Sequence, residues 1–92
     1  MSDKQIIITV SGIDKVGIVA RVATELASLE INIEDIKQTI MQNHFVMFML
    51  GNTGNSKFSF QEIKERLTNI GKELGMEVWV QKKEIFDNMH NI

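Results

Sequence analysis

The chain has 92 residues, enough for one domain and too few for a second hydrophobic core. Hydrophobic residues make up 43% and charged residues 24%, close to the globular average, so the chain is expected to fold. Ten basic and twelve acidic side chains give a formal net charge of −2, which argues against direct binding to nucleic acid. The absence of cysteine excludes disulfides, thiolate catalysis and Cys-ligated zinc.

The first half of the chain predicts a strand, a helix and a second strand. Residues 5–11 are β-branched and apolar and end at Gly12, as in a central strand. The apolar run 6–8 is too short for a signal peptide or a membrane span, so we expect a cytoplasmic protein without membrane contact. Apolar residues recur at helical spacing over residues 17–30. In the strand that begins at residue 31, the apolar positions change phase near residues 34–35, which predicts a β-bulge.

The second half predicts a turn at residues 42–44, a strand over 45–50 and a polar loop over 51–57. Ser59 and Glu62 form an S-x-x-E capping box, and Gly75 can end the helix that they begin. Residues 76–80 alternate as a fourth strand, and residues 85–92 suit a short amphipathic turn. The order β-α-β-β-α-β predicts an α+β, ferredoxin-like sandwich. We expect residues 1–92 to form this one domain, with a four-stranded antiparallel sheet and both helices on one face.

The strand over residues 45–50 carries large apolar residues on both faces, although the two helices can cover only one. Its second face needs cover, either from the C-terminal turn or from a partner chain. Trp79 faces opposite to Val78 and Val80 and adds to this surplus of apolar surface. We therefore expect a homodimer or a larger assembly.

The segment from Gly12 to Gly17 has the glycine spacing of a phosphate-binding loop, but Ile18 and Val19 stand where that motif requires Lys and Ser/Thr. What remains is a strand-to-helix turn, in which Gly17 permits backbone approach and the start of the helix attracts an anion. Asp14 can cap this helix, contact a ligand, or do both.

Other chemistry finds no support in the sequence. The two histidines, His44 and His90, are far apart and lack the carboxylate pattern of metal sites. Met41, Met47 and Met49 are more simply core residues than soft-metal ligands. An acylphosphatase-type site would need an arginine in the first turn, where Lys15 is the only cation. We predict no catalytic residue, no metal and no cofactor.

The segments Val10-Ser11-Gly12-Ile13-Asp14-Lys15-Val16-Gly17-Ile18-Val19-Ala20 and Leu29-Glu30-Ile31-Asn32-Ile33 together resemble the ACT-domain pattern. With the ending Ile85-Phe86-Asp87-Asn88-Met89-His90-Asn91-Ile92, the chain is similar to the small stand-alone bacterial ACT proteins related to glycine cleavage system regulators. One departure is Val16, which stands where many relatives carry proline, so the turn is less rigid.

This resemblance implies a non-catalytic regulatory domain that dimerises, often side by side, and senses an amino acid or similar small molecule at the interface. A separate protein partner would read the signal. The alternative is a structural protein-interaction domain with no ligand. The residues implied in ligand binding are Asp14, Val16, Gly17 and Ile18 in the turn, and Asn32 and Ile33 in the facing subunit.

Overall fold

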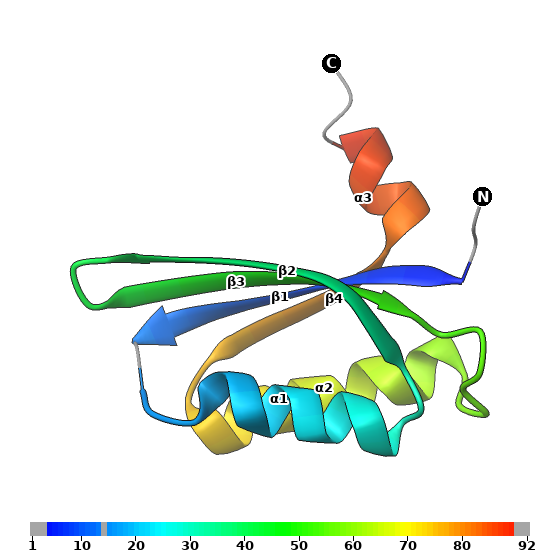
Figure 1. Cartoon of the computed structure of the whole chain (residues 1–92), viewed down its shortest axis with the longest axis horizontal. Coiled ribbons are helices and arrows are strands. Elements are labelled where there is room, and N and C mark those ends of the chain that lie inside the picture. Colours follow the sequence, from blue (N-terminus) through cyan, green and yellow to red (C-terminus); the bar gives the residue numbers. More distant parts are fainter. Residues whose placement is uncertain (1–3, 14, 90–92) are drawn as a thin grey trace.

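The computed structural model describes residues 4–13 and 15–89. In chain order its elements are β1 (Gln5–Ile13), α1 (Ile18–Ser28), β2 (Asn32–Met41), β3 (His44–Asn52), α2 (Phe60–Leu74), β4 (Glu77–Lys82) and α3 (Lys83–Met89). The strands form one antiparallel sheet in the order β2-β3-β1-β4. Helices α1 and α2 lie on one face of this sheet, and α3 stands on the other (Figure 1). The predicted ferredoxin-like fold is confirmed.

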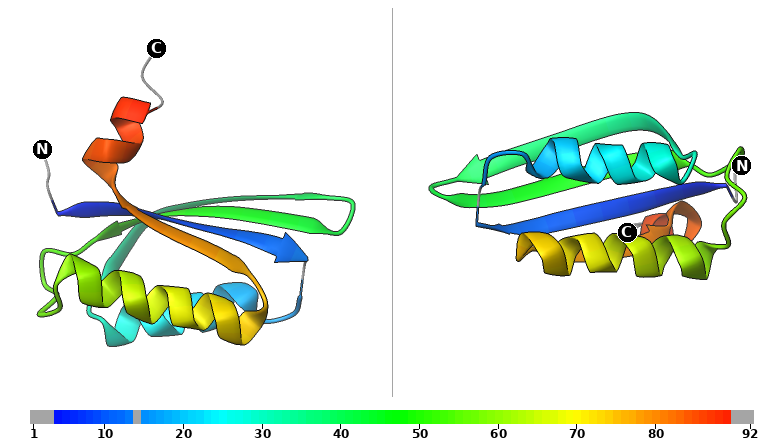
Figure 2. Two further views of the ribbon diagram at one scale, coloured as in Figure 1. Left: turned by 180° about the vertical axis from the view of Figure 1, so that it is seen from behind. Right: turned by 90° about the horizontal axis from the view of Figure 1, so that it is seen from below.

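The hydrophobic core lies between the sheet and the two long helices, which run side by side across it (Figure 2). Strand side chains alternate between faces, so Ile8 of β1 and Met47 of β3 point at the helices and are fully buried. Leu26 of α1 and Leu67 of α2 meet them from the opposite layer. Met49 is also fully buried, so the core prediction is confirmed for these two methionines. It is wrong for Met41, which ends β2 at the tip of the hairpin, beyond the helices, and is 75% exposed.

The capping box of α2 is present. The hydroxyl oxygen of Ser59 accepts a hydrogen bond from the backbone N–H of Glu62 at 3.1 Å, and the Glu62 carboxylate accepts one from the backbone N–H of Ser59 at 2.8 Å. At the other end, Gly75 adopts the left-handed conformation with φ 71°. Both ends of α2 are therefore fixed by local chemistry.

The strands extend further than their apolar residues predict. β1 continues to Ile13, where it pairs with His44, and β3 runs on to Asn52, which pairs with Gln5. The turn between β2 and β3 accordingly shrinks to residues 42–43. The predicted bulge is confirmed by the register shift between Ile33 and Asp35. The C-terminal turn is a seven-residue helix, α3, which follows β4 directly.

Ion pairs join the exposed flanks of α1 and α2. Arg21 donates two hydrogen bonds to the Glu73 carboxylate, at 2.9 and 3.2 Å, and Arg66 donates one to Glu25 at 2.8 Å. The guanidinium of Arg21 holds the pKa of Glu73 below its usual value, because it hydrogen-bonds the ionised carboxylate. Within residues 4–13 and 15–89, the helices are too short or too polar to cross a membrane.

Candidate functional site

The turn between β1 and α1 presents backbone rather than side chains at the start of the helix. Gly17 is the N-cap of α1, with φ 89° and ψ 2°, so the cap position offers no side-chain acceptor. A Cβ at Gly17 would meet no atom within 4 Å, which shows that the space beside it is open. Val16 is fully exposed, whereas Ile18 is buried and anchors the first helical turn to the core. Asp14 lies outside the described residues.

Lys15 ties this turn to the end of the other helix. Its ammonium group donates a hydrogen bond to the backbone carbonyl of Leu74 at 2.9 Å, at the C-terminus of α2. A cation is favourable there, because the last carbonyls of a helix lack partners within it and carry partial negative charge. The lysine therefore positions the turn against α2.

The two other predicted site residues lie at the start of β2. Asn32 is exposed and pairs in register with Asn52 of β3, while Ile33 is half-buried and packs against the core. β2 is an edge strand, so its outer backbone groups face away from the sheet. Beyond the bulge it also carries Ile36 and Ile40, which remain exposed.

Within one chain, the structure does not bring the turn and the start of β2 together. Residues 18–28 of α1 separate Gly17 from Asn32, and a helix of that length spans about 16 Å. The two groups therefore lie at opposite ends of α1 (Figure 1). Val16, Gly17 and Ile18 are adjacent to one another, and Asn32 is adjacent only to Ile33.

A serine and a histidine meet on the open side of the sheet. The Ser11 hydroxyl lies 3.1 Å from the Nε2 atom of His44. Nucleophilic catalysis would also require a third group that orients the imidazole, and the described contacts of His44 include none. Over residues 4–13 and 15–89, no cluster of three or more His, Asp or Glu side chains is placed to hold a metal ion. His90 lies outside the described residues.

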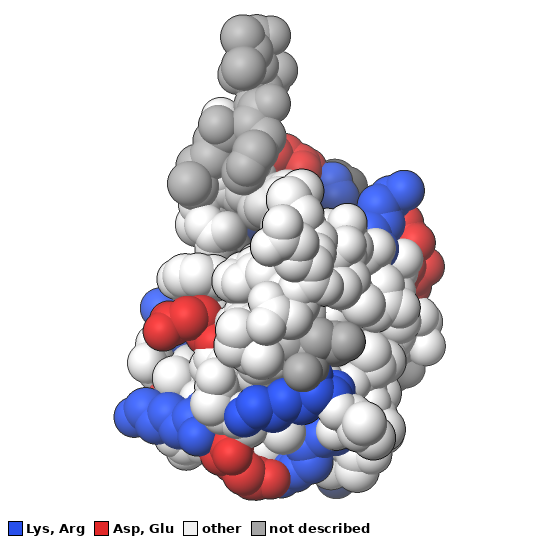
Figure 3. Space-filling model, turned by 90° about the vertical axis from the view of Figure 1, so that its left-hand side faces the viewer, with Lys and Arg blue, Asp and Glu red and all other residues white. Residues whose placement is uncertain are grey.

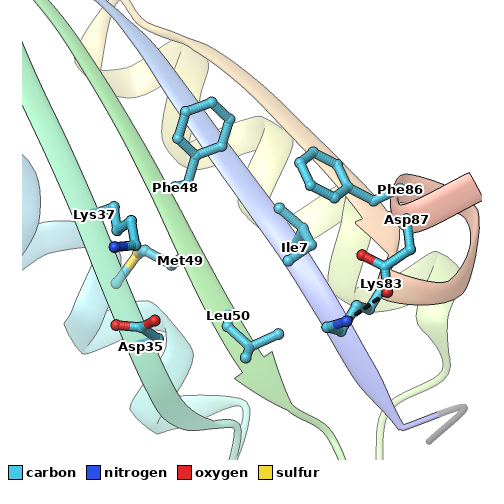
Figure 4. Close-up of a pocket in the computed structure, with 9 residues that line it drawn as sticks. All are labelled: Ile7, Asp35, Lys37, Phe48, Met49, Leu50, Lys83, Phe86 and Asp87. Carbon is cyan, nitrogen blue, oxygen red and sulfur yellow. Dashed lines mark hydrogen bonds and ion pairs between the residues drawn. The ribbon is translucent and has the colours of Figure 1, made fainter. Parts of the chain in front are cut away.

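A groove of about 340 Å³ lies between the open face of the sheet and α3. Ile7 and Leu50 line its floor, and the rings of Phe48 and Phe86 meet across one end with centroids 6.4 Å apart (Figure 4). One sequence signal points to this groove, because the third strand is apolar on both faces. No sequence signal indicates that Phe86 is the residue that covers Phe48. Charged residues stand at the rim: Asp35, Lys37, Lys83 and Asp87.

Comparison with known proteins identifies the family of this fold. Residues 4–81 match the ACT domain. A UPF0237 protein of Methanosarcina acetivorans is 46% identical over 92 residues, the full length of both chains. An ACT domain protein from Streptococcus pneumoniae has a TM-score of 0.79 at 35% identity, over 90% of this chain and 93% of that one. The regulatory subunit of aspartate kinase from Thermus thermophilus has a TM-score of 0.67 at 25% identity, over 88% of this chain and 52% of that one.

ACT domains are regulatory and non-catalytic. The family match covers most of the described residues, and the archaeal relative aligns from end to end with nearly half its residues identical. Sequence, strand order and helix placement agree, and the chain belongs to the ACT-domain family.

Proposed function

We propose that this chain is a regulatory module that binds an amino acid, or a similar small molecule, between two copies of itself. In this proposal one copy supplies the turn and its partner supplies the start of β2. The observation that carries the proposal is the open approach to the N-terminus of α1 at Gly17. The proposed contact residues are Asp14, Val16, Gly17 and Ile18 of one copy and Asn32 and Ile33 of the other.

The start of α1 suits the carboxylate of an amino acid. The first N–H groups of a helix have no partner within it, and they lie at the positive end of the helix dipole. Gly17 supplies no side chain to satisfy them or to block an incoming group. A carboxylate there gains about 0.3–1 kcal/mol from the dipole alone. Such a contact orients a ligand, and further contacts must supply the rest of the affinity.

Asn32 suits the remaining polar groups of the same ligand. Its side-chain carbonyl can accept a hydrogen bond from an ammonium group, and its amide nitrogen can donate to a carboxylate. Because Asn32 lies at the far end of α1 in its own chain, this contact requires a second copy. The exposed edge of β2 supports such an assembly, since two antiparallel β2 edges would bring the start of one strand toward the far end of the other. Exposed Ile36 and Ile40 would gain cover along that edge.

The response would be transmitted to another protein, since ACT domains are non-catalytic. A ligand held between two copies stabilises their association, and by linkage the association strengthens ligand binding. A protein that recognises only the paired form would therefore respond to the ligand concentration.

Calorimetric titration with a panel of amino acids tests the proposal. We expect one member of the panel to bind with a dissociation constant below millimolar, and Asn32→Ala to weaken that binding without lowering the melting temperature. The matched control is Asn69→Ala, which removes an exposed side-chain amide on α2. This variant should bind the amino acid as tightly as the unmodified protein. If no amino acid binds, or if Asn32→Ala binds normally, the site assignment is wrong and the ligand-free interaction domain replaces it.

A further inference from the structure

The face of the sheet opposite α1 and α2, here called the open face, gathers exposed apolar side chains. Among the described residues, eight large hydrophobic side chains are exposed. Five of them belong to the open face or to the helix that stands on it: Ile13, Met41, Phe48, Trp79 and Ile85. Scattered exposed apolar residues are ordinary, whereas a group on one face marks an interaction surface.

Helix α3 covers only one end of the open face. Phe86 packs against Phe48, and Ile7 beneath them is 9% exposed. Trp79 lies on β4 in the same cross-strand row as Thr9 and Phe48, yet it remains 52% exposed. Met41, at the tip of the β2–β3 hairpin, is 75% exposed. Ile85 on α3 itself is 51% exposed. Of the two covers considered for the second face of the third strand, the C-terminal segment therefore supplies one at one end of the strand, and the other end stays bare.

The charges on this side follow the arrangement of an interface. The centre of the open face carries no charged side chain. It is formed by Thr9 and Ser11 of β1 and by Val46 of β3, which pairs with Ser11. At the end of the sheet away from α3, the surface is mainly uncharged, while charged side chains gather over the helical layer below (Figure 3). The acidic and basic side chains of the open face lie at its borders: Asp35 and Lys37 on β2, Glu77 on β4, and Lys83 and Asp87 on α3. A neutral centre with a charged rim is the usual anatomy of a protein–protein interface.

We propose that the open face binds a second copy of this chain, sheet against sheet, with α3 of each copy closing the bare end of the other. A two-fold axis that lies between the sheets, perpendicular to the strands, would make the strands of the two copies run in opposite directions. Each α3 would then lie over the end of the partner's open face that the partner's own α3 leaves bare. Sheets packed face to face lie about 10 Å apart. Seven residues of helix are also about 10 Å long, so α3 matches the height of the space between the sheets. Ile85 would then contact the partner.

The area available favours a protein over a small molecule. Four strands of up to ten residues give the face an outline of about 20 by 30 Å, or about 600 Å². α3 stands on one end of this outline, and the flank of that helix offers area in its place. Two copies would therefore bury about 1,200 Å² in total, at the lower end of the range for stable complexes. A small ligand in the groove beside Phe86 would cover only the end that α3 already shields. Ile13 and Met41, at the other end of the strands, would stay in water.

Trp79 provides a native probe, because it is the only tryptophan of the chain. Two quantities are measured together over a dilution series. One is the quenching of Trp79 fluorescence by acrylamide, and the other is the molecular mass from light scattering. We expect Trp79 to be shielded at high concentration, and dilution to lower the mass and raise the quenching constant in parallel. Without dilution, Ile85→Lys should lower the mass and raise the quenching constant to the same extent. It should also shift the Trp79 emission to longer wavelength. Asn69→Lys makes the same change in charge on α2 and should do neither.

This interface is separate from the β2 edge of the proposed function, and the probe distinguishes the two. Ile40→Lys disturbs the β2 edge and should reduce the mass while Trp79 stays shielded, because β4 lies at the opposite edge of the sheet. Circular dichroism checks folding, and Ile13→Lys, on the inner strand β1, replaces Ile85→Lys if that variant fails to fold. The proposal is overturned if acrylamide quenches Trp79 as readily in the concentrated unmodified protein as in Ile85→Lys. It is equally overturned if Trp79 is shielded in particles of monomer mass, which would indicate cover within the chain or by a small molecule.

Discussion

At the scale of single residues, Gly71 is the clearest case in which context reverses a local preference. Helix propensity alone predicts that a glycine at this position weakens the last turns of α2. In the structure it is buried where α2 crosses β4, and a Cβ there would lie 2.6 Å from Cγ2 of Val78 and 2.9 Å from the backbone carbonyl oxygen of Met76. The sequence could not indicate this, because the approach depends on residues that follow the helix and fold back beneath it.

The sign of one substitution separates the two interpretations of Gly71. Helix propensity alone predicts that Gly71→Ala stabilises the protein by about 1 kcal/mol. The contact with β4 predicts that it destabilises the protein by about 1–3 kcal/mol, because the methyl group presses against backbone as well as a side chain. The free energy of unfolding in urea measures the difference, with Asn69→Ala on the exposed side of α2 as control. A gain in stability would show that α2 and β4 are not in close contact at this point.

At the scale of elements, helix boundaries were predictable where their signals are local. Ser59, Glu62 and Gly75 fix α2 within a few residues of sequence, so the pattern was sufficient to place both ends. The ends of β1 and β3 were underestimated, because Gly12, Ile13 and Asn52 are held by pairing between distant strands. The helical form of the C-terminal segment was also missed in part, since α3 begins at Lys83, before the apolar residues that suggested a turn.

The relative importance of cap and core in α2 is open to direct measurement. Ser59→Ala removes one side-chain acceptor and should cost about 1 kcal/mol of unfolding free energy. Leu67→Ala opens a cavity beneath a side chain that is 1% exposed and should cost about 2–5 kcal/mol. Chemical denaturation of both variants gives the order. A larger loss for Ser59→Ala would mean that Leu67 does not occupy the core position assigned to it.

At the scale of the whole molecule, the order of elements predicted the fold class, because few topologies join β-α-β-β-α-β without crossing connections. The arrangement of the candidate site was not predictable from pattern alone. Gly17 and Asn32 lie at opposite ends of one helix, and only the resemblance to ACT domains suggested that a second copy joins them. The bare end of the open face poses the same difficulty. A single chain reveals which surface lacks cover, while its partner must be inferred from shape and charge.

A mixing experiment tests most directly whether the ligand site is shared between two copies. Val16→Asp places a repelling carboxylate in one copy's turn, at an exposed position with no packing role, and Asn32→Ala removes the partner's contact. Each variant alone should bind the ligand more weakly than the unmodified protein. After the two are mixed and allowed to exchange subunits, every mixed dimer holds one doubly altered site and one intact site, so calorimetry should recover about a quarter of the original sites at full affinity. No recovery in a mixture whose exchange is verified would contradict a shared site and confine the binding residues to one chain.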